Sequence, residues 1–285
     1  MMSSRADIVI SRFARRLLRE QYVLVLSAEP GVLAGRIEPL HDMRVAIRRL
    51  RSLLKAFRKA LPRPEADALE TRFRRLSKKL GPARDMDVWM RALKSMRTPG
   101  IEEWRKFVEH QRGIQKRKKE SLHRILADLS TRSLKADFNR FLTRPADVPP
   151  SARLEELAVK AVRKSIDRVM ERSHIAPSFS ARKAHLLRIA CRRARYMAEF
   201  FTATLGRPIA QLARQLKTVQ DVLGDIHDCD ICLAHLRRAP IHPPGLAAEL
   251  NRRRRAHVAR FGKSWKRLEG SVLPFTCQSP AATAH

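Results

Sequence analysis

The chain has 285 residues and a hydrophobic content of 44%, so it is long enough to bury one large core or two smaller ones. No apolar run approaches the roughly 20 residues that a membrane-spanning helix needs, and four cysteines make no recognisable disulfide framework in a chain of this size. The chain has 60 Lys and Arg against 28 Asp and Glu, so its net charge is +32. Repulsion among these like charges destabilises a compact fold unless a polyanion compensates it.

The N-terminus does not have the character of a signal peptide, because its helical pattern is mixed in charge and lacks an apolar core. We therefore expect a soluble protein in the reducing environment of the cytoplasm. The positive charge leaves nucleic acid, an acidic membrane surface and a polyphosphate-like anion as candidate partners.

Almost every segment has the apolar period of a helix and none alternates convincingly as a strand, which predicts an all-α fold. A first helix is expected at about 5–26, ended by Pro30 and Gly31, because proline and glycine interrupt helices. Further helices follow at about 38–61, 65–80, 84–96 and 101–129, with a short one to Leu142. Residues 143–151 contain three prolines and form the expected linker.

The second half repeats this order of elements. Helices are expected at about 152–172, 180–205, 208–223, 227–238 and, beyond three further prolines, in a very basic stretch up to about 268. We expect two antiparallel helix bundles, four-helix in type, at 1–145 and 146–270, related by an internal pseudo-twofold axis. Residues 271–285 have the composition of a disordered tail.

Two phrases occur twice in the same order, which indicates two copies of one structural unit. The pattern H-x-x-R-x-x-x-R-R-x-R begins at His41 and returns 144 positions later at His185. The phrase LGPARDMDV, from Leu80, returns as LGDIHDCDI, from Leu223. Because the copies retain cations and not a nucleophile, their shared property is predicted to be anion binding.

A cationic stripe runs beside an apolar seam on each of the two helices that carry the first phrase, which we call the signature helices. The seam residues recur at spacings of three and four and the cations follow one position later, so the first stripe lies about 100° around the helix and is roughly 25 Å long. The first seam is Leu40, Met43, Ile47, Leu50, Leu54, Phe57 and Leu61, and the first stripe is His41, Arg44, Arg48, Arg51, Lys55 and Arg58. The second seam is Ala184, Leu187, Cys191, Ala194, Ala198, Phe201 and Leu205, and the second stripe is His185, Arg188, Arg192 and Arg195.

These stripes are predicted to bind a ligand and not only solvent. Solvated faces usually alternate in sign, because like charges four residues apart cost roughly 0.2–0.5 kcal/mol per pair. No acidic residue stands between Asp42 and Glu65, or between Glu171 and Glu199. Arg binds phosphate oxygens in a bidentate manner, and the histidine that heads each stripe is expected to titrate near neutral pH and to donate to phosphate when protonated.

The His-Asp pairs at His41-Asp42 and His227-Asp228 allow a metal-dependent phosphohydrolase as an alternative. The repeat argues against it, because the residue that follows His185 is not acidic and no further histidines stand at ligand spacing.

The C-x-x-C at Cys229 and Cys232 could be a redox or zinc signature. These positions align with Met86 and Trp89 in the first copy, which favours buried structural cysteines. Of the remaining cysteines, Cys191 belongs to the second seam and Cys277 lies near the C-terminus.

Paired acids follow each Leu-Gly phrase, and we expect them in the first turn of a helix, where they cap N–H groups and pair with stripe arginines. A magnesium site is the alternative. The acids are Asp85, Asp87, Asp228 and Asp230.

Four linked motifs resemble those of the CHAD domain, the conserved histidine α-helical domain: HDMRVAIRRLRSLLKAF, LGPARDMDV, HLLRIACRRARYMAEFF and LKTVQDVLGDIHDCDI. The resemblance spans nearly the whole chain. It implies two four-helix bundles related by pseudo-symmetry, a basic central cavity, and binding of inorganic polyphosphate, often at polyphosphate granules, without demonstrated catalysis. A triphosphate-tunnel hydrolase domain often accompanies this family; none is recognised here, so we expect no coupled hydrolysis.

The resemblance places the polyphosphate-binding candidates on the two stripes and on two other basic helices. They are His41, Arg44, Arg48, Arg51 and Lys55, then His185, Arg188, Arg192 and Arg195, with Lys116, Lys119, Arg252 and Arg255 as further candidates. The neighbouring Arg49 and Arg193 are expected to point elsewhere. The repeat has two departures, because Glu199 stands in place of Lys55 and His227 in place of Arg84.

The sequence therefore predicts a non-enzymatic protein without metal or cofactor that binds inorganic polyphosphate through its charge, with no membrane partner. Sequence-independent binding of nucleic-acid backbone is the alternative, because charge alone does not separate the two polyanions. The aromatic content of 6% weakens the case for a single-strand binder that stacks bases.

Overall fold

The computed structural model describes residues 5–96, 101–128, 132–144, 153–173 and 179–276. Every regular element in these ranges is an α-helix, which confirms the predicted all-α class. The chain divides into two compact units, of which the first ends at Arg153 and the second begins at Leu154. The linker expected at 143–151 falls mostly outside the described residues.

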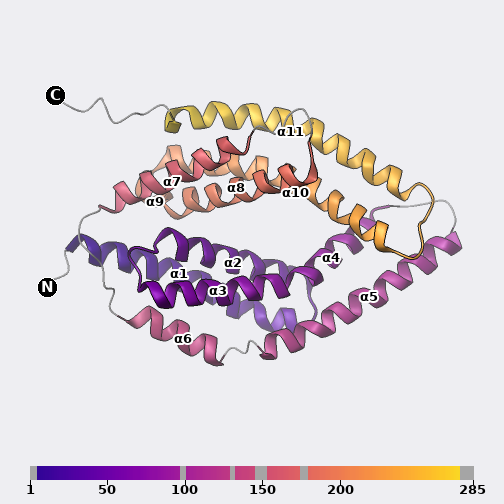
Figure 1. Cartoon of the computed structure of the whole chain (residues 1–285), viewed down its shortest axis with the longest axis horizontal. Helices are drawn as coiled ribbons and strands as arrows, with labels where there is room; N and C mark the ends of the chain where they lie inside the picture. Colours follow the sequence, from indigo (N-terminus) through magenta and orange to yellow (C-terminus); the bar gives the residue numbers. More distant parts are fainter. Residues whose placement is uncertain (1–4, 97–100, 129–131, 145–152, 174–178, 277–285) are drawn as a thin grey trace. The chain divides into compact units, whose positions relative to one another are not determined.

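The first unit is built around its second helix (Figure 1). Its elements are α1 (Arg5–Leu33), α2 (Ile37–Ala56), α3 (Arg63–Lys79), α4 (Gly81–Lys94), α5 (Ile101–Asp128) and α6 (Arg132–Thr143). Helix α2 packs on α1, α3 and α4, while α5 packs on α4 and α1, and α6 packs on α3.

The seam of α2 forms much of the core of this unit, as the sequence predicts. All seven seam residues are buried, from Leu40 to Leu61. Beside them, Tyr22 of α1, Phe73 of α3 and Phe138 of α6 form an aromatic cluster, with ring centroids 4.1 Å apart for Tyr22 and Phe138 and 5.9 Å apart for Phe73 and Phe138. The cluster anchors the short α6 to the rest of the unit.

The second unit is a closed ring of four long helices. Its elements are α7 (Leu154–Glu171), α8 (Ala181–Phe200), the short α9 (Thr202–Leu205), α10 (Arg207–Arg238) and α11 (Leu246–Thr276). Helix α7 packs on α8, α8 on α10, α10 on α11, and α11 returns to α7. Figure 1 shows α8 and α10 side by side. The seam of α8 is buried except for Leu205, which belongs to α9 and is partly exposed.

Both signature helices end earlier than predicted, at equivalent phenylalanines. The backbone leaves helical geometry at Phe57 (φ −98°, ψ 17°) and at Phe201 (φ −104°, ψ 11°). Both rings are fully buried. The apolar period therefore continues past the end of each helix, because these side chains are buried in the core although they lie outside the helix.

The predicted helix end at Pro30 is wrong, because α1 continues to Leu33. Pro30 lies in the last turn, and its own carbonyl accepts the Ala34 N–H at 3.0 Å, so the turn closes around it. The chain reverses at Gly35, whose φ of 69° is a conformation that residues other than glycine rarely adopt. Gly31 lets α2 approach, since a Cβ there would lie 2.4 Å from Cγ of Pro39.

Helix α10 is uninterrupted where the repeat predicts two helices, so the expected break between residues 223 and 227 is wrong. In the first unit α3 gives way to α4 at Leu80, just before Gly81 and Pro82. Proline has no N–H to bond to the preceding turn, and its ring crowds the carbonyl there. Asp225 stands in place of Pro82 and keeps its N–H, so the helix continues past Gly224.

The predicted disordered tail begins too early. Helix α11 continues to Thr276 and buries Leu268 and Val272, which are four residues apart on one face. The rest of the predicted tail, including Cys277, falls outside the described residues.

We expect Gly31→Ala to lower the free energy of unfolding by about 1–3 kcal/mol, because the rigid Pro39 ring cannot move aside for the added methyl group. Gly262→Ala in α11 is the matched control: no atom lies within 4 Å of its added Cβ, and alanine favours a helix by about 1 kcal/mol over glycine. Chemical denaturation followed by circular dichroism measures both. Equal effects of the two substitutions would contradict the tight contact.

Candidate anion-binding site

The stripe residues lie next to the buried seam of each signature helix and are themselves half-buried near its middle. Arg44, Arg48 and Arg51 are partly buried on α2, whereas His41 and Lys55 are exposed toward its two ends. On α8 all four members of the second stripe are partly buried. Partial burial restricts the side chains and raises the cost of placing like charges together, because less water screens them.

The two repeated phrases meet where the first stripe arginine crosses a glycine of the neighbouring helix. Arg44 Nη1 donates to the Ser77 carbonyl at 3.1 Å and lies 3.5 Å from the position that a Cβ on Gly81 would take. In the second unit a Cβ on Gly224 would lie 3.7 Å from Arg188 Nε. The repeated Leu-Gly phrase therefore provides space for a guanidinium, a role that its duplication signals but that sequence reasoning missed.

The head of the first stripe places a histidine among cationic groups. Burial lowers the pKa of His41, and the charges of Arg84 and Arg48 lower it further, against a smaller opposing effect of Asp42. Arg48 Nε is buried and has no hydrogen-bond partner among the residues that the structure describes. A buried guanidinium N–H without a partner is costly, so this group is available to a ligand.

The head of the second stripe has the same design with two histidines. The rings of His185 and His227 lie 4.7 Å apart between centroids. Burial lowers the pKa of His227 to about 3, helped by the charges of Arg188, His185 and Arg192. Burial and the charges of the same two arginines also lower the pKa of His185, whose buried Nδ1 finds no hydrogen-bond partner in the described parts of the chain.

These shifts correct the expectation that His41 and His185 titrate near neutral pH. Both have their pKa lowered from 6.5, because burial and neighbouring arginines disfavour the imidazolium. Without a ligand, burial and the arginine charges therefore favour the neutral form of both rings. His227, which replaces Arg84 in the repeat, turns one permanent charge into a neutral ring.

The far ends of the stripes differ from the heads, because each contains a carboxylate. Arg51 and Lys55 both bind Oε1 of Glu70 on α3, at 2.9 and 3.2 Å. Burial opposes ionisation of Glu70, but these two cations outweigh it and lower its pKa. Arg195 donates to Glu199 at 2.8 Å on its own helix. Glu199 therefore neutralises the far end of the second stripe from the same helix, whereas Glu70 neutralises the far end of the first stripe from a neighbouring helix.

The acids of the second phrase are not helix caps, which corrects that expectation. Helix α4 begins at Gly81 and α10 runs without a break, so no acid stands in a first turn of either helix. Asp87 is buried and accepts from Gln115 of α5 at 2.9 Å. Asp230 accepts from Arg254 of α11 at 2.7 Å. Both acids therefore join their helix to the next one along the chain.

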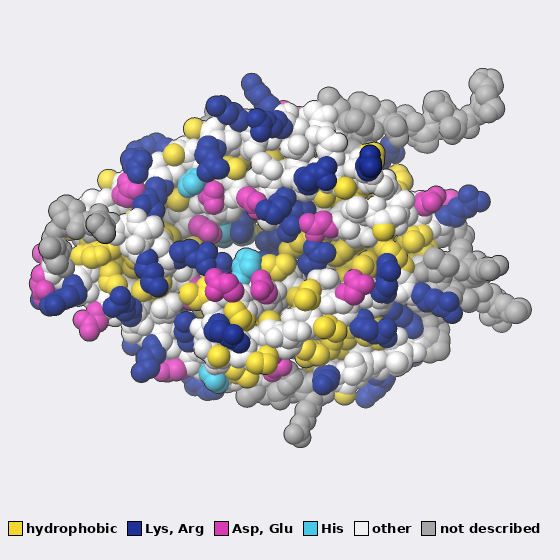
Figure 2. Space-filling model, turned by 180° about the vertical axis from the view of Figure 1, so that it is seen from behind, with side chains coloured by type: hydrophobic (Ala, Val, Ile, Leu, Met, Phe, Trp, Pro, Cys, Tyr) yellow, Lys and Arg dark blue, Asp and Glu magenta, His cyan; other side chains and the backbone are white. Residues whose placement is uncertain are grey.

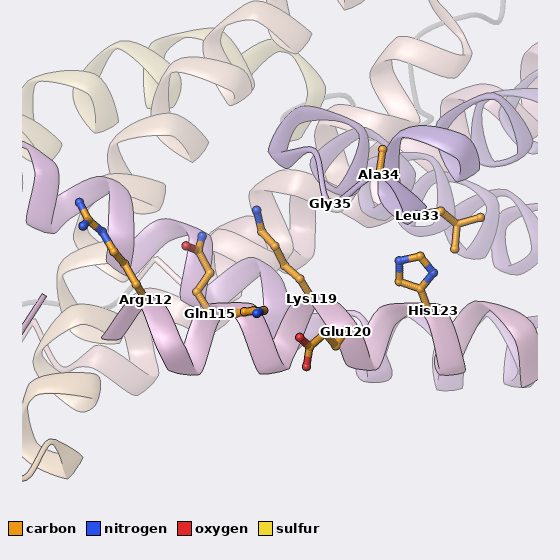
Figure 3. Close-up of a pocket in the computed structure, with 9 residues that line it drawn as sticks. Leu33, Ala34, Gly35, Arg112, Gln115, Lys119, Glu120 and His123 are labelled. Carbon is orange, nitrogen blue, oxygen red and sulfur yellow. The ribbon is translucent and has the colours of Figure 1, made fainter. Parts of the chain in front are cut away.

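The further candidates lie apart from the stripes. Lys116 and Lys119 line a pocket beside the turn between α1 and α2 (Figure 3). Arg252 is held by two hydrogen bonds to Glu249, and Arg255 is exposed. On α11 it is Arg254 that faces α10.

The cysteines of the second unit are structural, as the alignment with the first copy predicts. Cys191, Cys229 and Cys232 are buried and form no disulfide. Met86 and Trp89, which are equivalent to Cys229 and Cys232 in the first copy, are also buried. Burial raises the pKa of Cys229 to about 11 and that of Cys232 to about 12. Thiols that stay protonated are poor nucleophiles and poor metal ligands.

Within the described ranges, no group of three or more His, Cys, Asp or Glu residues could hold a metal ion. The same part of the chain contains no helix with the length and apolar character to cross a bilayer.

On the face that Figure 2 shows, Lys and Arg side chains are widely spread, with fewer Asp and Glu among them. The charge surplus is therefore not confined to the stripes.

Comparisons with known proteins agree on one fold. The family model described as CHAD domain matches residues 16–237. The crystal structure of the CHAD domain from the plant Ricinus communis is similar at 22% identity and a TM-score of 0.68, covering 98% of this chain and 95% of that one. PptA from Streptomyces chartreusis is similar at 16% identity and a TM-score of 0.65, covering 90% and 99%. No curated protein matches the sequence.

Acid should destabilise the protein through His227, and His227→Gln should relieve this effect. The unfolded chain takes up a proton at this residue near pH 6.5, whereas the folded chain does so only near 3. The free energy of unfolding therefore falls as the pH falls from about 7 towards 3, by at most about 1.4 kcal/mol per pH unit from this group.

Chemical denaturation at several pH values, without polyanion, measures this slope. The His227→Gln variant should lose less stability on acidification than the wild type, while His242→Gln, at an exposed position, should follow the wild type. Parallel pH profiles of the wild type and His227→Gln would show that burial does not hold this ring neutral.

Proposed function

The chain belongs to the CHAD domain family, and on that premise we propose that it binds inorganic polyphosphate without catalysing a reaction on it. The observation that carries the proposal is the pair of equivalent stripe heads, in each of which burial and neighbouring arginines lower the pKa of the histidine. Each head also contains a buried nitrogen without a hydrogen-bond partner in the described structure, Arg48 Nε in one and His185 Nδ1 in the other. A phosphate oxygen would accept a hydrogen bond from Arg48 Nε, and from His185 Nδ1 when that nitrogen carries the proton.

We extend the proposal to the arrangement that the family resemblance implies. Two four-helix bundles related by a pseudo-twofold axis would place both stripes on one basic central cavity, so that a single polymer reaches both heads. The matching registers of the two seams support this arrangement, as do the matching approaches of Arg44 to Gly81 and Arg188 to Gly224.

The proposed mechanism is electrostatic. Arginine forks bind phosphate oxygens, the polymer releases its counterions, and affinity falls steeply with salt. A bound anion also offsets the arginine charges that lower the pKa of His41 and His185. Binding is therefore coupled to proton uptake, and a protonated ring adds a further donor to the site.

The absence of catalysis is part of this proposal. His227 belongs to one of the two His-Asp pairs that suggested a hydrolase, and a pKa lowered to about 3 makes it a poor general base at neutral pH. Protonated thiols at Cys229 and Cys232 offer no nucleophile either. The site of action that we propose is the cytoplasm, including polyphosphate granules.

Nucleic-acid backbone is the second candidate ligand, and the wide spread of Lys and Arg over the visible face favours it (Figure 2). Duplex DNA presents its phosphates at fixed spacing along a stiff rod, whereas polyphosphate is a flexible thread of higher charge density. Stripes whose middle arginines are half-buried suit the thread better than the rod.

Titrating long polyphosphate, duplex DNA and single-stranded RNA at matched salt should show the tightest binding per phosphate for polyphosphate. Affinity should fall steeply as salt is raised, because each arginine–phosphate contact releases counterions. The same mixtures, supplied with magnesium, should release no free phosphate above a protein-free blank. Equal affinities per phosphate would overturn the choice of ligand, and steady phosphate release would overturn the absence of catalysis.

Replacing Arg48 and Arg192 together by alanine should weaken polyphosphate binding by about 150-fold or more, because charged hydrogen bonds contribute about 1.5–3 kcal/mol each. The dependence of log affinity on log salt should also become shallower by roughly 1–2. The matched control is Arg49→Ala with Arg193→Ala, which removes the same charge from adjacent positions on the same helices. Similar losses in both double variants, with helicity retained, would mean that overall charge and not the stripes binds the polymer.

A further inference from the structure

The first unit contains a second cationic site, separate from the stripe heads. It is an open pocket of about 430 Å³, within the range of roughly 300–1,000 Å³ that is typical of small-molecule sites. One wall is α5, and the other is the turn from Leu33 to Gly35 that joins α1 to α2. Figure 3 shows the side chains that line it.

Helical spacing brings the basic groups of this pocket onto one face of α5. Arg112, Lys116, Lys119 and His123 follow one another at intervals of four, three and four residues, which is the repeat of a single helix face. Figure 3 shows Arg112, Lys119 and His123 directed toward the side of the α1–α2 turn. Glu120, the acid among the lining residues, points away from them.

These basic groups differ from the cations at the start of the same helix. Arg105 and Lys106 share Glu102, at 2.8 and 3.5 Å. In contrast, Arg112, Lys116, Lys119 and His123 make no hydrogen bond or ion pair with any residue that the structure describes. Like charges at these spacings repel, so this face of α5 gains most from an external anion.

The opposite wall lies close to α5 at one point. Gly35 turns with φ 69°, and the stem of Lys119 passes close to it, with Cδ 3.5 Å from the position of an added Cβ. Gln115, which also lines the pocket, is fixed by its hydrogen bond to the buried Asp87. The lysine stems and the α1–α2 turn therefore form the walls of the pocket, and the bond of Gln115 to Asp87 fixes α5 against α4.

We propose that this pocket binds a compact oligophosphate group, either a short free oligophosphate or the end of a polyphosphate chain. Three permanent cations and a histidine line one pocket, which suits an anion that carries several charges better than a single carboxylate. The ligand class rests on the proposed function, but the site is separate from the stripes.

Calorimetric titration with sodium tripolyphosphate tests the site. Lys116→Ala with Lys119→Ala should weaken binding roughly tenfold or more, because two charged donors are lost. Arg117→Ala with Lys118→Ala is the matched control: these exposed cations on the same helix do not line the pocket, so the variant should bind tripolyphosphate within about twofold of the wild type. Tripolyphosphate should also shift the ring resonances of His123 in the wild type and not in the lysine variant.

Two further arms separate this site from the proposed function and separate the two sources of phosphate. The Arg48→Ala, Arg192→Ala variant should lose long-chain polyphosphate with esterified ends yet keep tripolyphosphate. Long polymer with esterified ends should displace tripolyphosphate poorly, whereas free-ended polymer should displace it if the pocket takes chain ends. Displacement by neither polymer would assign the pocket to free oligophosphates.

Equal tripolyphosphate affinity in the two α5 double variants would overturn the pocket and leave the stripes untouched. Conversely, a stripe variant that still binds long polymer with esterified ends, beside a lysine variant that has lost tripolyphosphate, would overturn the proposed function and leave the pocket standing.

Discussion

Each stripe depends on the placement of arginines beside a buried apolar seam, where they cannot turn fully into water. The seam of α2 packs into the first unit and that of α8 into the second, so the cations one position along each helix are held at the edge of a core. Low local screening strengthens their repulsion. Burial and that positive potential together lower the pKa values of His41, His185 and His227.

The two copies reach the same electrostatic result with different residues. Glu70 on α3 neutralises the far end of the first stripe, whereas Glu199 on α8 itself neutralises the second. At the heads, Arg84 in one copy is replaced by His227 in the other, and in each case the neighbouring histidine has a lowered pKa. What the copies preserve is therefore a positive head and a neutralised far end.

This division matters for ligand binding because each head combines positive potential with a buried nitrogen that lacks a hydrogen-bond partner in the described structure. A polyanion bound there would relieve repulsion within the protein as well as gain contacts, and it would do so more strongly when the histidines are protonated. The basic face of α5 has the same character on a smaller scale, with unpaired cations beside a narrow turn. Charge in this protein is thus concentrated at defined places against a broadly basic surface.

Sequence alone determined the helical class, the two seams and the register of the repeat, because apolar spacing reports which face of a helix is buried. It also identified Cys229 and Cys232 as core positions, through their alignment with Met86 and Trp89. Tertiary structure decided the helix ends at Phe57 and Phe201, the passage of α1 through Pro30, and the neutrality of the histidines. These depend on which groups lie near in space, through burial, Coulomb interaction and steric contact, and spacing along the chain does not encode such distances.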